Sequence, residues 1–193
     1  MINVQSRLRE RRLRIEQGGD EGFTLIELLV VLLIIGILLA IAIPTFLSVT
    51  KTANNTAAQA DLQTALTGAK TYFEQANQTY AGVFNSTTYS NITAVDTGLN
   101  FVSATGSAGS STAANDVSIS APTGSYVALA SFSTGTKECW AILDITATLS
   151  PAIWGQSAVG TYYGLAKASS STTCNAATTT LVTGLVTNGF PTG

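Results

Sequence analysis

The chain has 193 residues, with 9 basic and 11 acidic side chains, a formal net charge of -2 and no histidine. This length suits one modest domain plus a membrane segment. Without histidine, no Ser-His or Cys-His catalytic pair can be drawn, and two cysteines alone fall short of the four ligands of a zinc site. We therefore expect neither an enzyme nor a metal or cofactor protein.

The basic residues are concentrated at the start of the chain. Positive charge beside a membrane span is retained in the cytoplasm, so we expect residues 1–22 inside and the rest of the chain outside. A nucleic-acid-binding patch would look similar, but only four lysines follow Gly22, against seven acids, and no nucleic-acid partner is expected. The arginines concerned are Arg7, Arg9, Arg11, Arg12 and Arg14.

An almost uninterrupted apolar segment follows from Phe23 to Val49. It is long enough to cross a bilayer core of about 30 Å. An ordinary secretory signal has a shorter apolar core of about 7 to 15 residues and a small-residue cleavage site behind it. Here the run is longer and Pro44 is followed by Thr45, Phe46 and Leu47, so we expect the segment to remain in the mature chain.

Glu27 is the anomaly of this segment. An ionised carboxylate in hydrocarbon costs at least a few kcal/mol, so a buried acid there is functional by default and needs a partner. Cleavage after Gly22 would create a free amine on Phe23, one helical turn from Glu27. The alternative is that Glu27 reaches the nearby interface and has no specific partner.

The apolar segment continues into an amphipathic one without a helix-ending cluster. Apolar residues recur there at steps of three and four, which predicts one helix over residues 23–77, half in the membrane and half on a globular head. Pro44 removes a backbone donor and predicts a kink, with Gly36 a second weak point. The apolar positions are Ala58, Leu62, Leu66, Ala69, Phe73 and Ala76.

The remainder predicts a sheet, and hence an α+β fold. Residues 78–115 form a connecting region, with a short helix from Ser90 to Asp96, a short strand from Leu99 to Val102 and a surface loop from Ser103 to Ala114. Residues 116–193 hold an antiparallel meander with a hairpin at residues 134–136. The tail from Leu181 is too rich in Gly and Thr to assign. The predicted strands are Val117–Ala121, Tyr126–Ser133, Glu138–Ile145 and Thr161–Lys167.

Cys139 and Cys174 are the two cysteines, and both belong to the part expected outside. An oxidising compartment favours a disulfide between them. Two unrelated buried thiols are the alternative.

These features together resemble a type IV prepilin, the precursor of type IV pilus and pseudopilin subunits. The resemblance is carried by Gly22, Phe23 and Glu27, the apolar segment through Pro44, and the cysteine pair. It is strong over residues 22 to about 80 and architectural beyond. Asp20 and Glu21 stand where the family often has a basic residue.

The resemblance implies three processing and assembly roles. A membrane prepilin peptidase would cut after Gly22 and methylate the amine of Phe23, and Glu27 would direct assembly. An assembly platform and its ATPase would polymerise the chain from the inner membrane into a homo-oligomeric helical filament at the cell surface. Such filaments serve adhesion, motility or DNA uptake. The implied division is a cleaved leader at 1–22, a membrane or filament-core segment at 23–49 and a head at 50–193.

Two other functions compete with a major pilus subunit. A type II secretion pseudopilin would share the helix, but its calcium loop needs carboxylates, and no Asp or Glu follows Asp144. A minor tip pilin would act as an adhesin or DNA receptor; such subunits often lack the assembly carboxylate that Glu27 supplies here.

Overall fold

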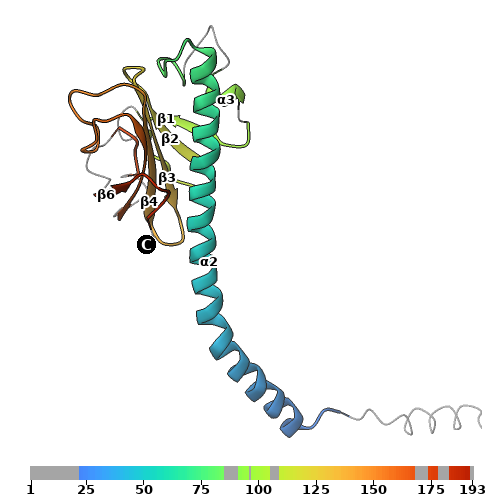
Figure 1. The fold of residues 1–193 in the computed structure, drawn as a ribbon. Coiled ribbons are helices and arrows are strands. Elements are labelled where there is room, and N and C mark those ends of the chain that lie inside the picture. The colour runs from blue at the N-terminus through green and yellow to red at the C-terminus, as the bar shows by residue number, and fades with distance from the viewer. Residues whose placement is uncertain are drawn as a thin grey trace, which may run out of the picture. The chain divides into compact units, whose positions relative to one another are not determined.

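The computed structural model describes residues 22–84, 91–95, 97–104, 109–167, 174–177 and 183–191. It shows the expected α+β fold, with a long helix and a six-stranded sheet (Figure 1). The chain divides into two compact units, with the boundary between Phe46 and Leu47. The arginine-rich start of the chain, Ser90 and Asp96 lie outside the described residues. The elements are α2 (Leu25–Gln75), α3 (Ile92–Val95), β1 (Asn100–Ser103), β2 (Asp116–Ser120), β3 (Tyr126–Ser133), β4 (Glu138–Ile145), β5 (Gly160–Lys167) and β6 (Thr183–Val186).

Helix α2 confirms the predicted long helix and ends two residues earlier than expected. It continues through Gly36 and Pro44, and the Thr45 hydroxyl donates to the Ala42 carbonyl at 2.9 Å. The helix stops because Asn77 and Gln78 both take the left-handed conformation (φ 53° and 60°). The Gln78 N–H then bonds the Phe73 carbonyl at 3.0 Å, which is the closing bond of a Schellman cap. The kink at Gly36 and Pro44 stays a prediction.

The sheet has the order β1-β2-β3-β4-β5-β6. Strands β3 and β4 have the predicted bounds and face each other from Tyr126↔Ile145 to Ser133↔Glu138, as the hairpin requires. The antiparallel meander predicted for residues 116–193 is confirmed from β2 to β6, whereas the short strand β1 ahead of it pairs with β2 in parallel. Residue alternation predicts a strand but not its direction. The direction depends on the connection, and the long connection between Ser103 and Asp116 leaves room for the crossover that parallel neighbours need.

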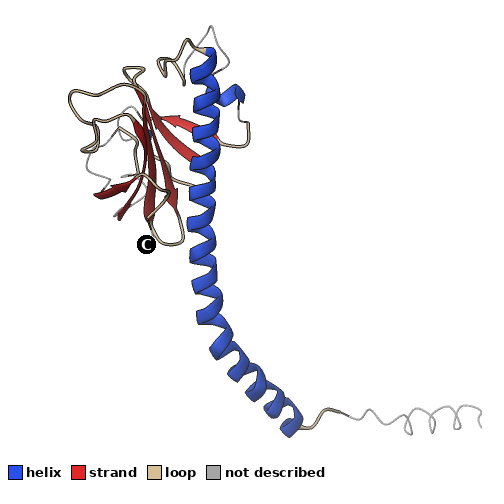
Figure 2. Cartoon of the chain, viewed as in Figure 1, coloured by secondary structure: helices blue, strands red, loops and turns tan. Residues whose placement is uncertain are grey.

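Both faces of the sheet are buried. One face packs on the half of α2 that begins at Leu47, where the predicted apolar positions are buried and Phe73 is partly buried (Figure 2). Val127 and Leu129 point to this side, whereas Ala128 and Ala130 belong to a second cluster. That second cluster is covered by the loop around Trp154 and by the disulfide segment, and the sequence did not predict this layer.

The predicted surface loop from Ser103 to Ala114 is partly a buried element, which corrects the sequence-based expectation. Ser111 is fully buried, and its hydroxyl donates to the Asp116 carbonyl (2.8 Å) and accepts from the Phe132 N–H (2.9 Å). The regular β2–β3 register extends only to Ser118↔Ala130. Where β2 diverges from β3, the Ser111 hydroxyl therefore takes the place of a direct backbone hydrogen bond between the strands. One serine in a Ser-rich segment gives no sequence signal for this role.

A buried polar cluster joins α2 to the far end of β4. Asp144 is 6% exposed, and its carboxylate accepts from the Tyr80 hydroxyl at 2.6 Å and from the Thr161 hydroxyl. Lys70 Nζ lies 3.4 Å from the Asp144 carboxylate. Burial, and next the hydrogen bond to Asp144, raise the pKa of Tyr80 well above its usual value. The cluster thus holds the phenol neutral and satisfies a buried carboxylate.

We expect Tyr80→Phe to destabilise the head by about 2 kcal/mol, because a hydrogen bond to a charged acceptor is lost. Because the folded pKa of Tyr80 is raised, its contribution is fully present below the unfolded pKa of about 10 and is lost at higher pH. Urea unfolding of the full chain in detergent at neutral and alkaline pH measures both effects. Tyr72→Phe is the matched control, since its hydroxyl donates to the neutral Ala81 carbonyl. Equal losses in the two variants would contradict a charge-assisted bond.

Candidate functional site

The start of α2 is built around Thr24 and Glu27, which form a reciprocal helix cap. The Thr24 hydroxyl accepts from the Glu27 N–H at 3.2 Å. One oxygen of the Glu27 carboxylate, Oε2, accepts from the Thr24 N–H (2.9 Å) and from the Thr24 hydroxyl (2.8 Å). This is a capping box, in which two backbone donors of the first turn are satisfied. It fixes the carboxylate beside the beginning of the helix.

The sequence contains the signal for this cap, because Thr-x-x-Glu directly ahead of an apolar run is the capping-box pattern. The predicted assembly role of Glu27 did not depend on this pattern. The cap gives Glu27 a local role in starting the helix, and it uses only one carboxylate oxygen, Oε2. The arrangement therefore leaves one face of the acid for another donor.

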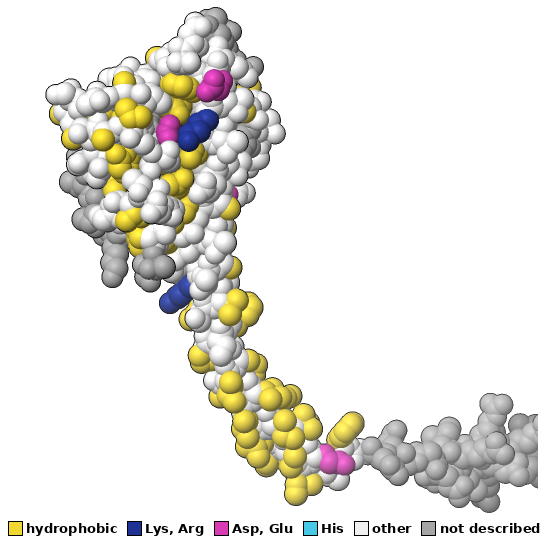
Figure 3. Space-filling model, in the orientation of Figure 1, with side chains coloured by type: hydrophobic (Ala, Val, Ile, Leu, Met, Phe, Trp, Pro, Cys, Tyr) yellow, Lys and Arg dark blue, Asp and Glu magenta, His cyan; other side chains and the backbone are white. Residues whose placement is uncertain are grey.

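The surroundings of Glu27 are apolar and exposed. From Gly22 to Val49 every residue is exposed, and the hydrophobic side chains cover this part of α2 (Figure 3). Phe23 is 88% exposed. The helix has an 18-residue window of mean hydropathy 3.2 with none of it buried, so it is long and apolar enough to cross a membrane. Such a surface needs lipid or other apolar helices around it.

The structure brings only some of the predicted site residues together. Gly22, Phe23 and Glu27 are neighbours at the start of α2, whereas Gly36 and Pro44 lie farther along the helix. Cys139 and Cys174 form the predicted disulfide in the head, with their Cα atoms 5.4 Å apart. It ties the start of β4 to the segment 174–177, and the Cys174 carbonyl accepts from the Ser111 N–H at 2.9 Å.

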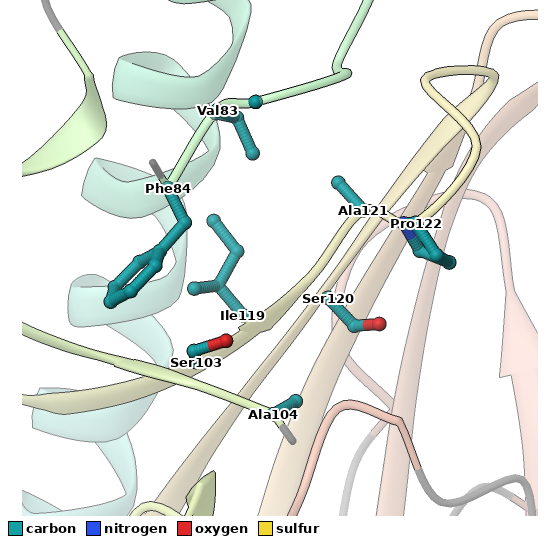
Figure 4. Close-up of a pocket in the computed structure, with 9 residues that line it drawn as sticks. Val83, Phe84, Ser103, Ala104, Ile119, Ser120, Ala121 and Pro122 are labelled. Carbon is teal, nitrogen blue, oxygen red and sulfur yellow. The ribbon is translucent and has the colours of Figure 1, made fainter. Parts of the chain in front are cut away.

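The head also has a small cavity of about 250 Å³ beside β1 and β2. Figure 4 shows that apolar side chains and two serine hydroxyls line it. Its described lining has no titratable side chain, so those residues offer no acid or base for chemistry. The lining residues are Gly82, Val83, Phe84, Ser103, Ala104, Ile119, Ser120, Ala121 and Pro122.

Two comparisons with known proteins found a match to this chain. Residues 19–43 match the family described as the prokaryotic N-terminal methylation motif. The chain is 43% identical over 56 residues to the type IV major pilin protein PilA of Myxococcus xanthus (strain DK1622). That match covers 29% of this chain and 26% of the relative, so the chain spans about a quarter of the relative's length. No solved structure matches.

Three observations now agree. The methylation motif covers the start of the long helix, a type IV pilin shares part of the sequence, and a mostly antiparallel sheet with a disulfide packs on the second half of that helix. The first defines the segment that pilins share, and the last supplies the globular part expected behind it. These matches and the fold support a resemblance of this chain to the type IV pilins.

Proposed function

We propose that this chain is the structural subunit of a type IV pilus, cut after Gly22, methylated on Phe23 and polymerised through the first half of α2. The observation that carries the proposal is the exposed apolar first half of α2, most of which lies within the methylation motif at residues 19–43. A subunit needs such a helix twice. It holds the precursor in the bilayer, and later it packs against copies of itself in a filament core.

The similarity to a type IV major pilin favours a pilus over a secretion pseudopilin or a minor tip pilin. The prepilin peptidase, assembly platform and ATPase are the partners that this function requires. Before assembly the chain would sit in the cytoplasmic membrane with its start inside, as the arginines predict. After assembly it would form part of an extracellular filament for adhesion, motility or DNA uptake.

Glu27 has a specific role in this proposal. The capping box engages one carboxylate oxygen, so the other can accept from the Phe23 amine of a neighbouring subunit. A charge pair formed in the dry filament core has few competing water molecules, and the lone buried acid of the membrane state becomes paired. Assembly would thus remove an unfavourable charge from the bilayer.

We expect filaments sheared from the cell surface to contain a chain that begins at a methylated Phe23. Intact-mass analysis should show loss of residues 1–22 and the added methyl group, and fragmentation should place that group on the terminal amine. Gly22→Leu is expected to remain full length in the membrane, because a bulky side chain at the cut would not fit a site for glycine. A mature chain that begins behind Pro44 would show an ordinary signal peptide and contradict the proposal.

A further inference from the structure

The lysines of the head gather at one end, where the β3–β4 hairpin meets α2. Lys51 is exposed on α2, two residues after Val49, and Lys137 is exposed in the hairpin turn. The β4–β5 register sets Lys167 opposite Glu138 at the same end. Only Lys70, among the four lysines that follow Gly22, lies at the other end, beside Asp144. We call Lys51 and Lys137 with residues 134–136 the hairpin end.

Close packing holds the hairpin against the helix. A Cβ built on Gly135 would lie 2.7 Å from Asn54 Nδ2 and 3.1 Å from the Lys51 Cα, so any other residue here would have to displace these neighbours. Asn55 Nδ2 donates to the Glu138 carboxylate at 2.8 Å. Lys137 therefore has a fixed backbone position close to Lys51, and both ammonium groups are available to solvent.

The acids at this end are already engaged in hydrogen bonds. Glu138 is half-buried and accepts from Asn55. Asp116, at the start of β2, accepts from Asn100 at 2.8 Å and from the Ala113 N–H at 3.0 Å. Lys51 and Lys137 are exposed, whereas both acids are half-buried and hydrogen-bonded, so the charge that the hairpin end presents to solvent is positive. The other described acids of the head lie farther along α2 or at the far end of β4, and they are Asp61, Glu74 and Asp144.

The hairpin end also adjoins the last exposed apolar side chains of the head unit. Leu47 and Val49 are 56% and 68% exposed, and Lys51 follows on the next residues of the same helix. An apolar stretch followed by lysine is the arrangement of a helix that leaves a bilayer, because the long stem stays near lipid and the ammonium reaches the headgroups. The position of Lys51 behind an apolar stretch and the positive charge of the hairpin end thus both indicate lipid headgroups as the partner.

We propose that the hairpin end docks on the phosphate groups of anionic phospholipids at the outer surface of the membrane that holds the unassembled subunit. This rests on the proposed membrane-anchored precursor. Each lysine near an anionic bilayer surface contributes attraction that corresponds to about a fivefold preference. Because Gly135, Asn55 and Glu138 hold the hairpin on α2, the two lysines project from backbone positions that are fixed relative to each other. The contact holds the head on the lipid until the subunit is extracted.

The test compares lysine reactivity in two kinds of vesicle. The full chain purified from membranes is reconstituted in phosphatidylcholine alone and in equal parts of phosphatidylcholine and phosphatidylglycerol. It is then treated with a water-soluble acetylating reagent, and peptide mass spectrometry gives the rate at each lysine. We expect Lys51 and Lys137 to react about fivefold more slowly in the anionic vesicles. Lys70 is the internal control, since it lies about 28 Å along α2 from Lys51, beyond the Debye length of about 10 Å.

Two variants sharpen the test. Lys137→Asn removes a charge with a residue that tolerates the left-handed backbone at this position (φ 58°), and it should weaken the lipid effect at Lys51. Lys70→Gln should leave that effect unchanged. Equal rates at Lys51 and Lys137 in both lipids would overturn the proposal. Protection that follows protein density and not anionic lipid would assign these lysines to subunit contacts and would also overturn it.

The same preparation separates this inference from the proposed function. Vesicles washed with alkaline carbonate should retain the chain if α2 spans the bilayer. Loss of the chain in the wash would reject membrane anchoring itself. Retention with equal acetylation rates would reject only the lipid docking of the hairpin end.

Discussion

Replacing Glu27 with alanine as the only copy of this chain in the cell should leave membrane insertion and cleavage intact but abolish most surface filaments. Insertion is favoured, because the substitution removes a charge that costs a few kcal/mol in hydrocarbon. Filament assembly loses the acceptor for the neighbouring Phe23 amine, so that amine would enter the filament core unpaired. An unpaired buried charge costs about 3 to 5 kcal/mol per subunit, and this cost recurs at every addition. Electron microscopy and the mass of sheared filaments measure the effect.

The capping box makes the interpretation of this variant sharper, since Glu27→Ala removes both the charge and one half of the cap. Glu27→Gln keeps an acceptor for the Thr24 N–H but has no charge, so it should fail to assemble like alanine. Thr24→Val breaks the cap and keeps the carboxylate, and should cost about 1 kcal/mol of helix stability while filaments still form. Normal filament number and length from Glu27→Ala would show that cohesion comes from helix packing alone.

Removing the disulfide should lower the stability of the head by about 3 to 4 kcal/mol, because the unfolded chain gains the freedom of a large closed loop. The paired cysteines are 35 residues apart in sequence. For a unit of this size the change corresponds to a fall in melting temperature of roughly 10 °C. Scanning calorimetry of the Cys139→Ser/Cys174→Ser double variant in detergent measures it, and the yield of surface filaments should fall with it.

A second variant distinguishes the contribution of the disulfide from that of the hydrogen bonds of Ser111 beside it. Ser111 bonds the Cys174 carbonyl through its backbone and bridges β2 and β3 through its hydroxyl. Ser111→Ala keeps the disulfide but leaves the buried Phe132 N–H and the Asp116 carbonyl without this partner, at about 1 to 3 kcal/mol. If the double cysteine variant melts at the temperature of the unmodified chain, the segment 174–177 is held by packing and not by the covalent bond.

Local patterns in the sequence were sufficient for the elements that have a single clear periodicity. The apolar run and its amphipathic continuation predicted α2 to within two residues at each end, because side-chain spacing directly reports which face of a helix is buried. Alternation predicted β3 and β4 with their bounds, and a short turn required them to pair as a hairpin. The motif around Gly22 and Glu27 needs no tertiary contact at all, since its residues are neighbours along one chain segment.

Tertiary structure decided what depends on distant segments meeting. The parallel direction of β1, the hydroxyl rung of Ser111 and the cover on the second sheet face involve residues that give no local periodic signal. Asp144 and Lys70 form an ion pair although they are far apart in the sequence. The residues around them show no local pattern that predicts this pair. The hairpin end exists only because Gly135 packs on α2 beside Lys51. Secondary structure follows from the spacing of apolar side chains along the chain. A surface charge pattern instead depends on which helices, strands and turns pack together in the folded protein.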